Sequence, residues 1–171
     1  QMENVKKEET TPSLGIQETK SGDRIAIVIL NYNTRKHLET FLPSVIANSP
    51  GARVIVADNG SPDDSVVWLK NNHPGVELID LHKNHGFAQG YNEALRQVVD
   101  ADIYVVLNSD VEVTPGWMAP IATAMRQDRS IGVAQPKILA WRDKVNTEKG
   151  QAAAVRFEYA GAAGGWIDFL G

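Results

Sequence analysis

Polar side chains follow three apolar stretches of the chain, directly where each stretch ends. These groups are Asn31-Tyr32-Asn33, Asp58-Asn59-Gly60 and Asn108-Ser109-Asp110. If the stretches are parallel strands, the groups meet at one edge of a sheet, where open α/β sheets bind ligands. Asp110 can hold Mg²⁺ or Mn²⁺ against a diphosphate, because one carboxylate with phosphate oxygens and water is a common coordination. Tyr32 can stack on a base and Asp58 can accept hydrogen bonds from a base or ribose, so the pattern predicts a nucleotide site.

Each of these residues also has a purely structural explanation. Asp-Asn-Gly is a common turn sequence, so Asp58 can simply stabilise that turn. Tyr32 can cover the edge of the sheet, and Asp110 can cap a following helix or interact with its dipole. The prediction of a binding site therefore depends on the three groups lying together.

A segment with two glycines, residues 84–92, adds a fourth candidate. Gly86 and Gly90 permit close backbone approach, and a helix N-terminus within the segment suits a phosphate. Taken alone, the two glycines can equally be a packing pair. The spacing matches neither the dinucleotide fingerprint nor the phosphate-binding P-loop.

Two other kinds of chemistry find no support. The chain has no Gly-x-Ser-x-Gly sequence, which a serine hydrolase of the α/β type would need. It has no pair of histidines at the four-residue spacing of the helical zinc motif. The histidines are interpreted as loop or surface residues: His37, His73, His82 and His85.

Apolar runs predict the strands that position the polar groups. The predicted strands comprise residues 25–30, 54–57, 76–81, 103–107, 131–134 and 138–141. Three of them (25–30, 54–57 and 103–107) are continuous apolar runs, typical of strands that are covered on both faces. Residues 76–81 alternate between apolar and polar, so we expect this strand nearer an edge.

Helices are predicted between these strands. Apolar residues from Leu38 to Ile46 follow helical spacing, with a kink or a new turn expected at Pro43. Ser61-Pro62 and Thr114-Pro115 are each interpreted as a cap followed by the first helical residue. Another helix is expected after residue 86. The alternation predicts an α/β fold with a mostly parallel, doubly wound (Rossmann-like) sheet and helices on both faces.

Composition and charge restrict the class of protein. The chain has 171 residues, 43% hydrophobic and 22% charged, enough for one globular domain. Its net charge of −4 argues against nonspecific binding to nucleic acid, which needs a basic surface. It has no cysteine, and no apolar run approaches the roughly 18 residues of a membrane span. We expect a cytoplasmic protein without a membrane span, with peripheral membrane association and oligomeric state left open.

Four motifs together resemble a known family. They are Ile-Val-Ile-Leu-Asn-Tyr-Asn (27–33), Val-Ala-Asp-Asn-Gly-Ser (56–61), Asn-His-Gly-Phe-Ala-Gln-Gly-Tyr-Asn (84–92) and Leu-Asn-Ser-Asp-Val-Glu-Val (107–113). In order and spacing they resemble the family 2 glycosyltransferases of the GT-A fold. The nearest likeness is to the rhamnosyltransferase-like branch of bacterial surface-polysaccharide synthesis, in its N-terminal donor-binding portion.

The resemblance implies an inverting glycosyltransferase that moves a sugar from a dTDP- or UDP-sugar to a growing glycan or lipid-linked acceptor. It implies a divalent metal, Mg²⁺ or Mn²⁺, held by Asp110 at the family's Asp-x-Asp position. The metal would neutralise charge on the leaving diphosphate. The nucleotide-binding residues that it implies are Leu30, Tyr32, Asp58, Gly86, Gly90, Asn92, Asn108 and Ser109.

The sequence departs from the family in two ways. Asn108 stands where the first Asp of Asp-x-Asp is expected, so metal binding would depend on Asp110. The catalytic base of an inverting displacement is expected beyond Gly171, since no residue here matches it and Asp168 lies too early.

The domain organisation follows from the positions of these motifs in the chain. Residues 1–23 are interpreted as a flexible polar tail and residues 24–142 as a nucleotide-sugar-binding domain of the GT-A type. Residues 143–171 are interpreted as the start of an acceptor-side region that is cut short.

Other functions remain as alternatives. The chain can be a noncatalytic nucleotide-binding module or an inactive fragment, because no catalytic base is identified. A nucleotidyltransferase would need a basic, glycine-rich loop after the first strand, and residues 31–35 do not form one. A phospho-receiver would need paired acids at the end of the first strand, where Asn31-Tyr32-Asn33 offers none.

Overall fold

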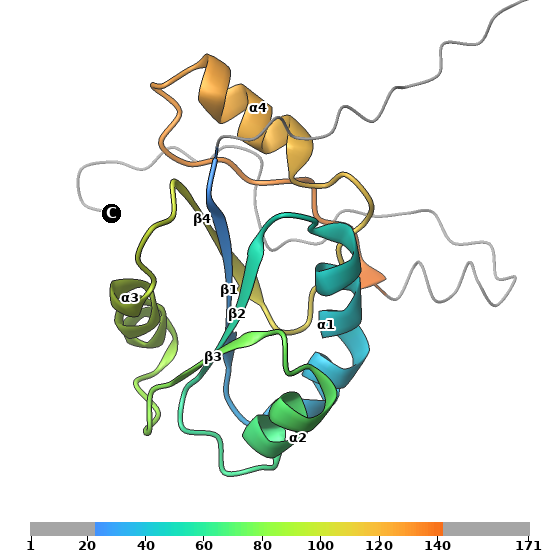
Figure 1. Ribbon diagram of the computed structural model, residues 1–171, viewed down its shortest axis with the longest axis vertical. Helices are drawn as coiled ribbons and strands as arrows, with labels where there is room; N and C mark the ends of the chain where they lie inside the picture. Colours follow the sequence, from blue (N-terminus) through green and yellow to red (C-terminus); the bar gives the residue numbers. More distant parts are fainter. Residues whose placement is uncertain (1–22, 142–171) are drawn as a thin grey trace, which may run out of the picture.

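The computed structural model describes residues 23–141, which form a parallel sheet between two layers of helices (Figure 1). The strands are β1 (Ile25–Asn31), β2 (Arg53–Asp58), β3 (Glu77–Asp80) and β4 (Ile103–Asn108). The helices are α1 (Arg35–Asn48), α2 (Ser65–Asn72), α3 (Phe87–Gln97) and α4 (Ala119–Gln127). The sheet order is β3-β2-β1-β4 and all three pairings are parallel, which confirms the predicted α/β fold.

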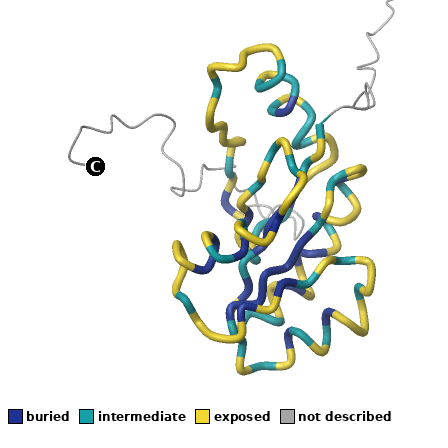
Figure 2. Tube along the Cα trace, turned by 60° about the vertical axis from the view of Figure 1, so that its left-hand side comes forward, coloured by how far each residue is buried: buried dark blue, intermediate teal, exposed yellow. Residues whose placement is uncertain are grey.

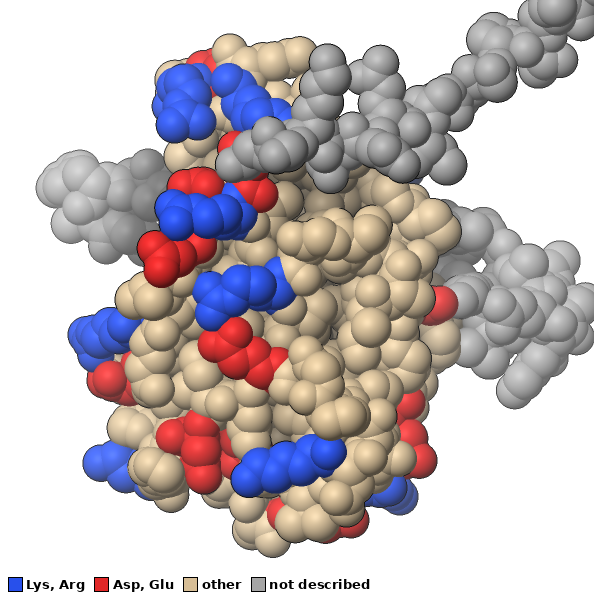
Figure 3. All heavy atoms as spheres, in the orientation of Figure 1, with Lys and Arg blue, Asp and Glu red and all other residues tan. Residues whose placement is uncertain are grey.

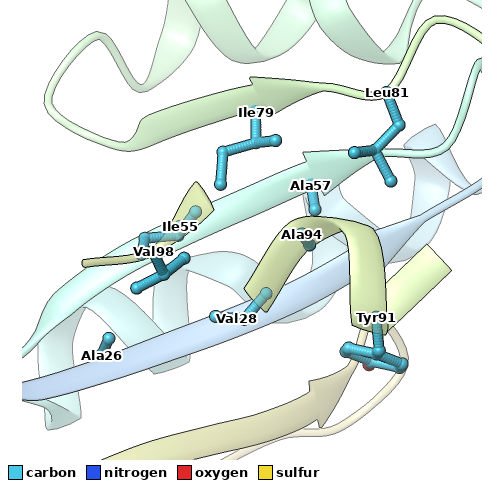
Figure 4. Packing of buried hydrophobic residues seen from close by; sticks show 9 residues of the cluster. All are labelled: Ala26, Val28, Ile55, Ala57, Ile79, Leu81, Tyr91, Ala94 and Val98. Atoms are coloured by element: carbon cyan, nitrogen blue, oxygen red, sulfur yellow. The ribbon is translucent and has the colours of Figure 1, made fainter. Parts of the chain in front are cut away.

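Alternate residues of the central strand β1 pack against different helices. Ala26 and Val28 belong to a core cluster with residues of α3, whereas Ile27 and Ile29 pack with residues of α1 and α2. All four side chains are at most 2% exposed. Figure 2 shows the buried positions concentrated along the strands, and Figure 4 shows the side chains gathered between α3 and the sheet. A continuous apolar run is therefore the pattern that a strand covered on both faces requires.

The predicted start of α2 at Ser61-Pro62 is wrong, because the helix begins at Ser65. The Ser61 hydroxyl accepts hydrogen bonds from the Asn31 side chain (3.0 Å) and from the backbone N–H of Asn33 (2.9 Å). It is thus occupied by the end of β1 instead of capping a helix. Asp63 accepts from the Ser65 backbone N–H (3.1 Å) just ahead of the helix.

The predicted start of α4 at Thr114-Pro115 is also wrong, since the helix begins at Ala119. Gly116 has a φ of +74°, a left-handed backbone conformation that cannot continue a right-handed helix. The Trp117 backbone N–H reaches the Thr114 carbonyl (3.3 Å), so this segment forms a separate turn. In α1, by contrast, the helix passes through Pro43 as one element to Asn48, and no second helix starts there.

Within the part of the chain that the structure describes, no strand forms at residues 131–134, and at residues 138–141 only Leu139 makes an isolated β-bridge. Val133 is 90% exposed, so its apolar character does not reflect burial in a sheet. β4 is consequently an edge of the described sheet. The prediction that residues 103–107 are covered on both faces is wrong, because Tyr104 and Val106 are exposed on one face of β4. β3 lies at the other edge, as its alternating pattern predicts.

The predicted polar tail (1–23) and acceptor-side region (143–171) fall almost entirely outside the described residues. Within residues 23–141, no helix is both long and apolar enough to cross a membrane.

Candidate functional site

A cleft of about 390 Å³ opens where the carboxyl ends of β1, β2 and β4 meet the first turns of α1 and α3. It is lined by Leu30, Tyr32, Thr34, His37, Asn59, Asn84, Gly86, Phe87, Asn108, Ser109 and Asp110. All three polar groups singled out in the sequence thus contribute at least one residue to a single cleft. Parallel pairing is the cause, because it places the carboxyl ends of all the strands at one edge.

A hydrogen bond from α3 supports the backbone next to the Asn108-Ser109-Asp110 turn. The buried Tyr91 hydroxyl donates a hydrogen bond to the Leu107 carbonyl (2.8 Å), immediately before the turn. Burial, and to a smaller degree the negative charge of Asp110, raises the pKa of the Tyr91 hydroxyl. The hydroxyl therefore stays protonated and able to donate throughout the neutral range.

Asp58 occupies a buried position at the end of β2 and does not line the cleft. The residue is 3% exposed, and its carboxylate accepts hydrogen bonds from the Asn31 side chain (2.9 Å) and from the Ser61 backbone N–H (2.9 Å). These bonds join the ends of β1 and β2. The turn-stabilising role is therefore present in the structure, and contact with a base or ribose stays a prediction.

Asn59 fastens the glycine-containing segment to the sheet. Its side-chain oxygen accepts the His85 backbone N–H (2.9 Å), and its amide nitrogen donates to the Gly86 carbonyl (3.0 Å) and the Asn84 side chain (3.2 Å). Gly86 has a φ of +77° and leads into α3, so the first turn of that helix faces the cleft. The sequence pattern assigned no role to Asn59; an asparagine within a strand-end turn was the available signal.

The remaining predicted residues occupy different places. Leu30 and Gly86 line the cleft. Gly90 lies inside α3, where a Cβ would approach Leu30 and the Asn59 amide to 3.0 Å, so its small size serves packing. Asn92 is an exposed residue of α3 that is not part of the cleft lining.

Five lining residues were not predicted individually from the sequence: Thr34, His37, Asn59, Asn84 and Phe87, of which the last three lie within segments that the sequence singled out. His37 lies in the first turn of α1, and Phe87 opens α3 with 65% of its surface exposed. An aromatic residue directly after a glycine at a predicted helix start is the signal by which Phe87 could have been found. Nothing in the local sequence distinguishes His37 from a surface histidine.

The donor atoms at the cleft suit a hard cation. Among residues 23–141, no group of three or more His, Cys, Asp or Glu side chains could hold a metal ion. The Asp110 carboxylate, the Ser109 hydroxyl and the Asn108 amide are oxygen donors, which Mg²⁺ and Mn²⁺ prefer. A cation that has one carboxylate from the protein needs further oxygens from a bound diphosphate and water.

Surface charge shows no sign of a nucleic-acid-binding face in the view of Figure 3. Basic and acidic side chains are interspersed on the visible face of the described part, without a continuous basic area. The net charge of the chain is −4.

Residues 26–165 match the family described as Glycosyl transferase family 2, which is most of the chain. The chain belongs to glycosyl transferase family 2. Among curated relatives in sequence, a low-salt glycan biosynthesis hexosyltransferase of Haloferax volcanii is 27% identical over 127 residues, covering 72% of this chain and 39% of that protein. An N-acetylglucosaminyl-diphospho-decaprenol L-rhamnosyltransferase of Mycobacterium tuberculosis is 28% identical over 127 residues, covering 68% and 41%. This family 2 chain thus spans about two fifths of these relatives' length.

Two solved structures share the fold of this family 2 chain. The mannosyltransferase PcManGT of Pyrobaculum calidifontis, in complex with GDP-Man and Mn²⁺, superposes with a TM-score of 0.55 at 22% identity, over 64% of this chain and 34% of that one. TarS of S. aureus in complex with UDP-GlcNAc gives a TM-score of 0.52 at 19% identity, over 66% and 37%. At these identities the likeness shows the GT-A type of fold.

Proposed function

We propose that this chain is the donor-binding part of an inverting glycosyltransferase. It binds a dTDP- or UDP-sugar together with Mg²⁺ or Mn²⁺, and the sugar passes to a growing glycan or a lipid-linked acceptor. The acceptor class follows the M. tuberculosis relative, whose name specifies a diphospho-decaprenol compound. Because a lipid-linked acceptor lies in a membrane, the proposal includes a cytoplasmic location with peripheral membrane association.

One observation carries the proposal: the Asn108-Ser109-Asp110 turn opens into the same cleft as Tyr32 and the Gly86 segment. A nucleoside diphosphate has an aromatic base and a negatively charged diphosphate group, which require different partners. Tyr32 is 43% exposed and offers a ring on which a base can stack. The backbone at Gly86 lies at the N-terminus of a helix, which favours negative charge.

The residues of this chain bind and orient the donor. The Asp110 carboxylate would hold the cation, and the side-chain oxygens of Ser109 and Asn108 would be the neighbouring donors. When bound, the cation neutralises the charge that grows on the leaving diphosphate. An inverting displacement needs a base on the face opposite the leaving group. Because none of the described residues is identified as this base, it is proposed to lie outside residues 23–141.

The second candidate is a noncatalytic nucleotide-binding module. Its support is that the chain spans 39% and 41% of the first two relatives, and a base is not identified among the described residues. A nucleotidyltransferase is less well supported, since residues 31–35 contain no glycine and do not form the glycine-rich basic loop that it would need after the first strand.

Calorimetric titration with UDP, dTDP and GDP, each with and without Mn²⁺, tests the donor site. We expect micromolar binding of one nucleotide, strengthened by Mn²⁺, with the metal effect lost in Asp110→Ala. Asp100→Ala is the matched control, because Asp100 is an exposed carboxylate that contacts Arg24 before β4, at the other end of the strand. Binding that is equally strong in Asp110→Ala with Mn²⁺ would contradict the metal role, and no binding of any nucleotide would contradict the donor site.

A further inference from the structure

A continuous series of hydrogen bonds crosses the carboxyl edge of the sheet beneath the cleft. The Asn31 amide nitrogen contacts the Asp58 carboxylate (2.9 Å), and the Asn31 side-chain oxygen contacts the Thr34 hydroxyl (2.7 Å). The Thr34 hydroxyl in turn lies 3.1 Å from the Ser109 hydroxyl. The series therefore links β2, β1 and the turn after β4, and it ends next to Asp110.

The direction of donation in this series is fixed by its buried end. Each oxygen of the Asp58 carboxylate accepts an N–H, one from Asn31 and one from the Ser61 backbone. An ionised carboxylate can only accept, so the Asn31 amide must turn its nitrogen toward Asp58 and its oxygen toward Thr34. Asn31 is fully buried, which leaves its amide no water with which to exchange these partners.

The same reasoning determines where the proton of Ser109 lies. Thr34 has one hydroxyl proton, and that proton is donated to the Asn31 oxygen. The contact between Thr34 and Ser109 then requires Ser109 to be the donor. Ser109 lines the cleft, so its hydroxyl presents lone pairs to a ligand there and has no second proton to give.

We infer that Thr34 is a positioning residue, which orients the Ser109 hydroxyl as an acceptor beside Asp110. An acceptor oxygen next to a carboxylate favours a divalent cation and disfavours a bare phosphate oxygen. Ser109 therefore lies on the cation side of a bound metal–nucleoside diphosphate. The inference rests on the proposed donor function and goes beyond it, because it assigns a role to Thr34, to Asn31 and to the direction of the Ser109 hydroxyl.

The quantity that tests the inference is the gain in UDP affinity on adding Mn²⁺, measured by calorimetry (with dTDP in place of UDP if the chain prefers it). In Thr34→Val the hydroxyl is lost while the branched shape is kept, and Ser109 is free to turn its proton into the cleft. We expect the Mn²⁺-dependent gain to fall about five- to tenfold, the size typical of one lost hydrogen bond. Affinity without Mn²⁺ should change less than about twofold, since the bare nucleotide does not use the oriented lone pairs.

Two further variants separate positioning from general damage. Thr34→Ser restores a hydroxyl and should restore the gain. Thr40→Val is the matched control, because the Thr40 hydroxyl bonds the Lys36 carbonyl on the exposed side of α1 (2.8 Å), and it should behave as wild type. An unchanged gain in Thr34→Val would overturn the inference, as would an equal loss of affinity with and without Mn²⁺.

A double-mutant cycle shows whether Thr34 acts through Ser109. If it does, Thr34→Val should have no further effect on the Mn²⁺-dependent gain in a Ser109→Ala background. Additive effects would mean that Thr34 contacts the ligand by itself and would overturn the inference. Failure of the wild type to bind any nucleotide would overturn the proposed function and this inference together, whereas wild-type binding with an unaltered Thr34→Val overturns the inference alone.

Discussion

Gly60, in the turn after β2, shows how tightly the strand ends are packed near the cleft. It has a φ of +73°, and a Cβ built on it would lie 2.6–2.8 Å from backbone atoms of Lys83. Real Cβ atoms do not approach backbone so closely, and a backbone segment cannot rotate away as a flexible side chain can. The position thus demands glycine for two separate reasons, conformation and space.

Replacing Gly60 by Ala should lower the free energy of unfolding by about 2–4 kcal/mol, from a left-handed backbone plus a backbone collision. Gly51→Ala is the matched control: Gly51 has a φ of +80° and nothing within 4 Å of a Cβ built there, so only the conformational cost of about 1–2 kcal/mol applies. Urea unfolding of both variants measures the difference. Equal destabilisation would contradict the collision with Lys83.

At the residue scale, the sequence predicted the cleft residues whose side-chain type and position at a strand end indicate binding. Tyr32 and Asp110 follow apolar runs closely, and both line the cleft. The sequence could not show that Asp58 is hydrogen-bonded to Asn31, or that Gly90 packs on Asn59, because these contacts join segments far apart in the chain. Their role as direct ligand contacts stays a prediction.

At the scale of elements, Arg24 and Asp102 connect the amino ends of two neighbouring strands. Arg24 precedes β1 and Asp102 precedes β4. The Arg24 backbone N–H (2.9 Å) and guanidinium (3.1 Å) both donate to the Asp102 carboxylate. Hydrogen bonds from the Arg24 side chain, then from its backbone, lower the pKa of Asp102 to about 2. The usual pKa for an unfolded chain is about 3.9, so the folded state favours the charged form.

This pKa shift predicts a specific acid sensitivity. Because the folded pKa is the lower one, the contribution of Asp102 is fully present above about pH 4 and is lost as pH falls toward about 2. The urea midpoint of the wild type should therefore fall more steeply across this range than that of Asp102→Asn. Arg24→Gln should show the same shallower dependence, and its Asp102 carboxyl should titrate nearer its ordinary pKa by NMR. Identical slopes in all three proteins would contradict the assignment.

Helices and strands could be predicted where the local sequence determines them, and not where a residue distant in the sequence does. Continuous apolar runs gave β1 and β2, since burial on both faces leaves a local trace. The predicted start of α2 was wrong because the Ser61 hydroxyl accepts a hydrogen bond from Asn31, which is 30 residues away in the sequence. No strand forms at residues 131–134, where Val133 is 90% exposed, because a short apolar run does not by itself determine whether a segment pairs with a sheet.

At the scale of the whole molecule, the proposed site lies between elements that must all be folded for it to exist. Its lining comes from the ends of β1, β2 and β4 and from α1 and α3. A ligand that binds only this arrangement stabilises the entire domain by mass action. Binding should therefore be visible as a change in global unfolding.

Nucleotide at about 100 times its dissociation constant, with Mn²⁺, should stabilise the fold by about 2.7 kcal/mol. For a domain of this size that raises the melting temperature by roughly 10 °C. Differential scanning fluorimetry with UDP and with dTDP measures the shift, and Asp110→Asn should reduce it to the value without metal. Inorganic pyrophosphate is the control ligand, because it lacks the base that Tyr32 is proposed to bind. An equal shift with pyrophosphate would contradict base recognition.

The central position of β1 also affects the order in which the domain can assemble during synthesis. β1 is the first strand of the described chain, yet one of its two neighbours is β4, with Ile25 paired to Ile103. At translation rates of roughly 5–20 residues per second, one edge of β1 waits several seconds for that neighbour to leave the ribosome. During this interval an apolar strand has an unpaired edge, the condition under which nascent chains engage chaperones. The cleft, which needs the end of β4, is therefore among the last features of the domain to form.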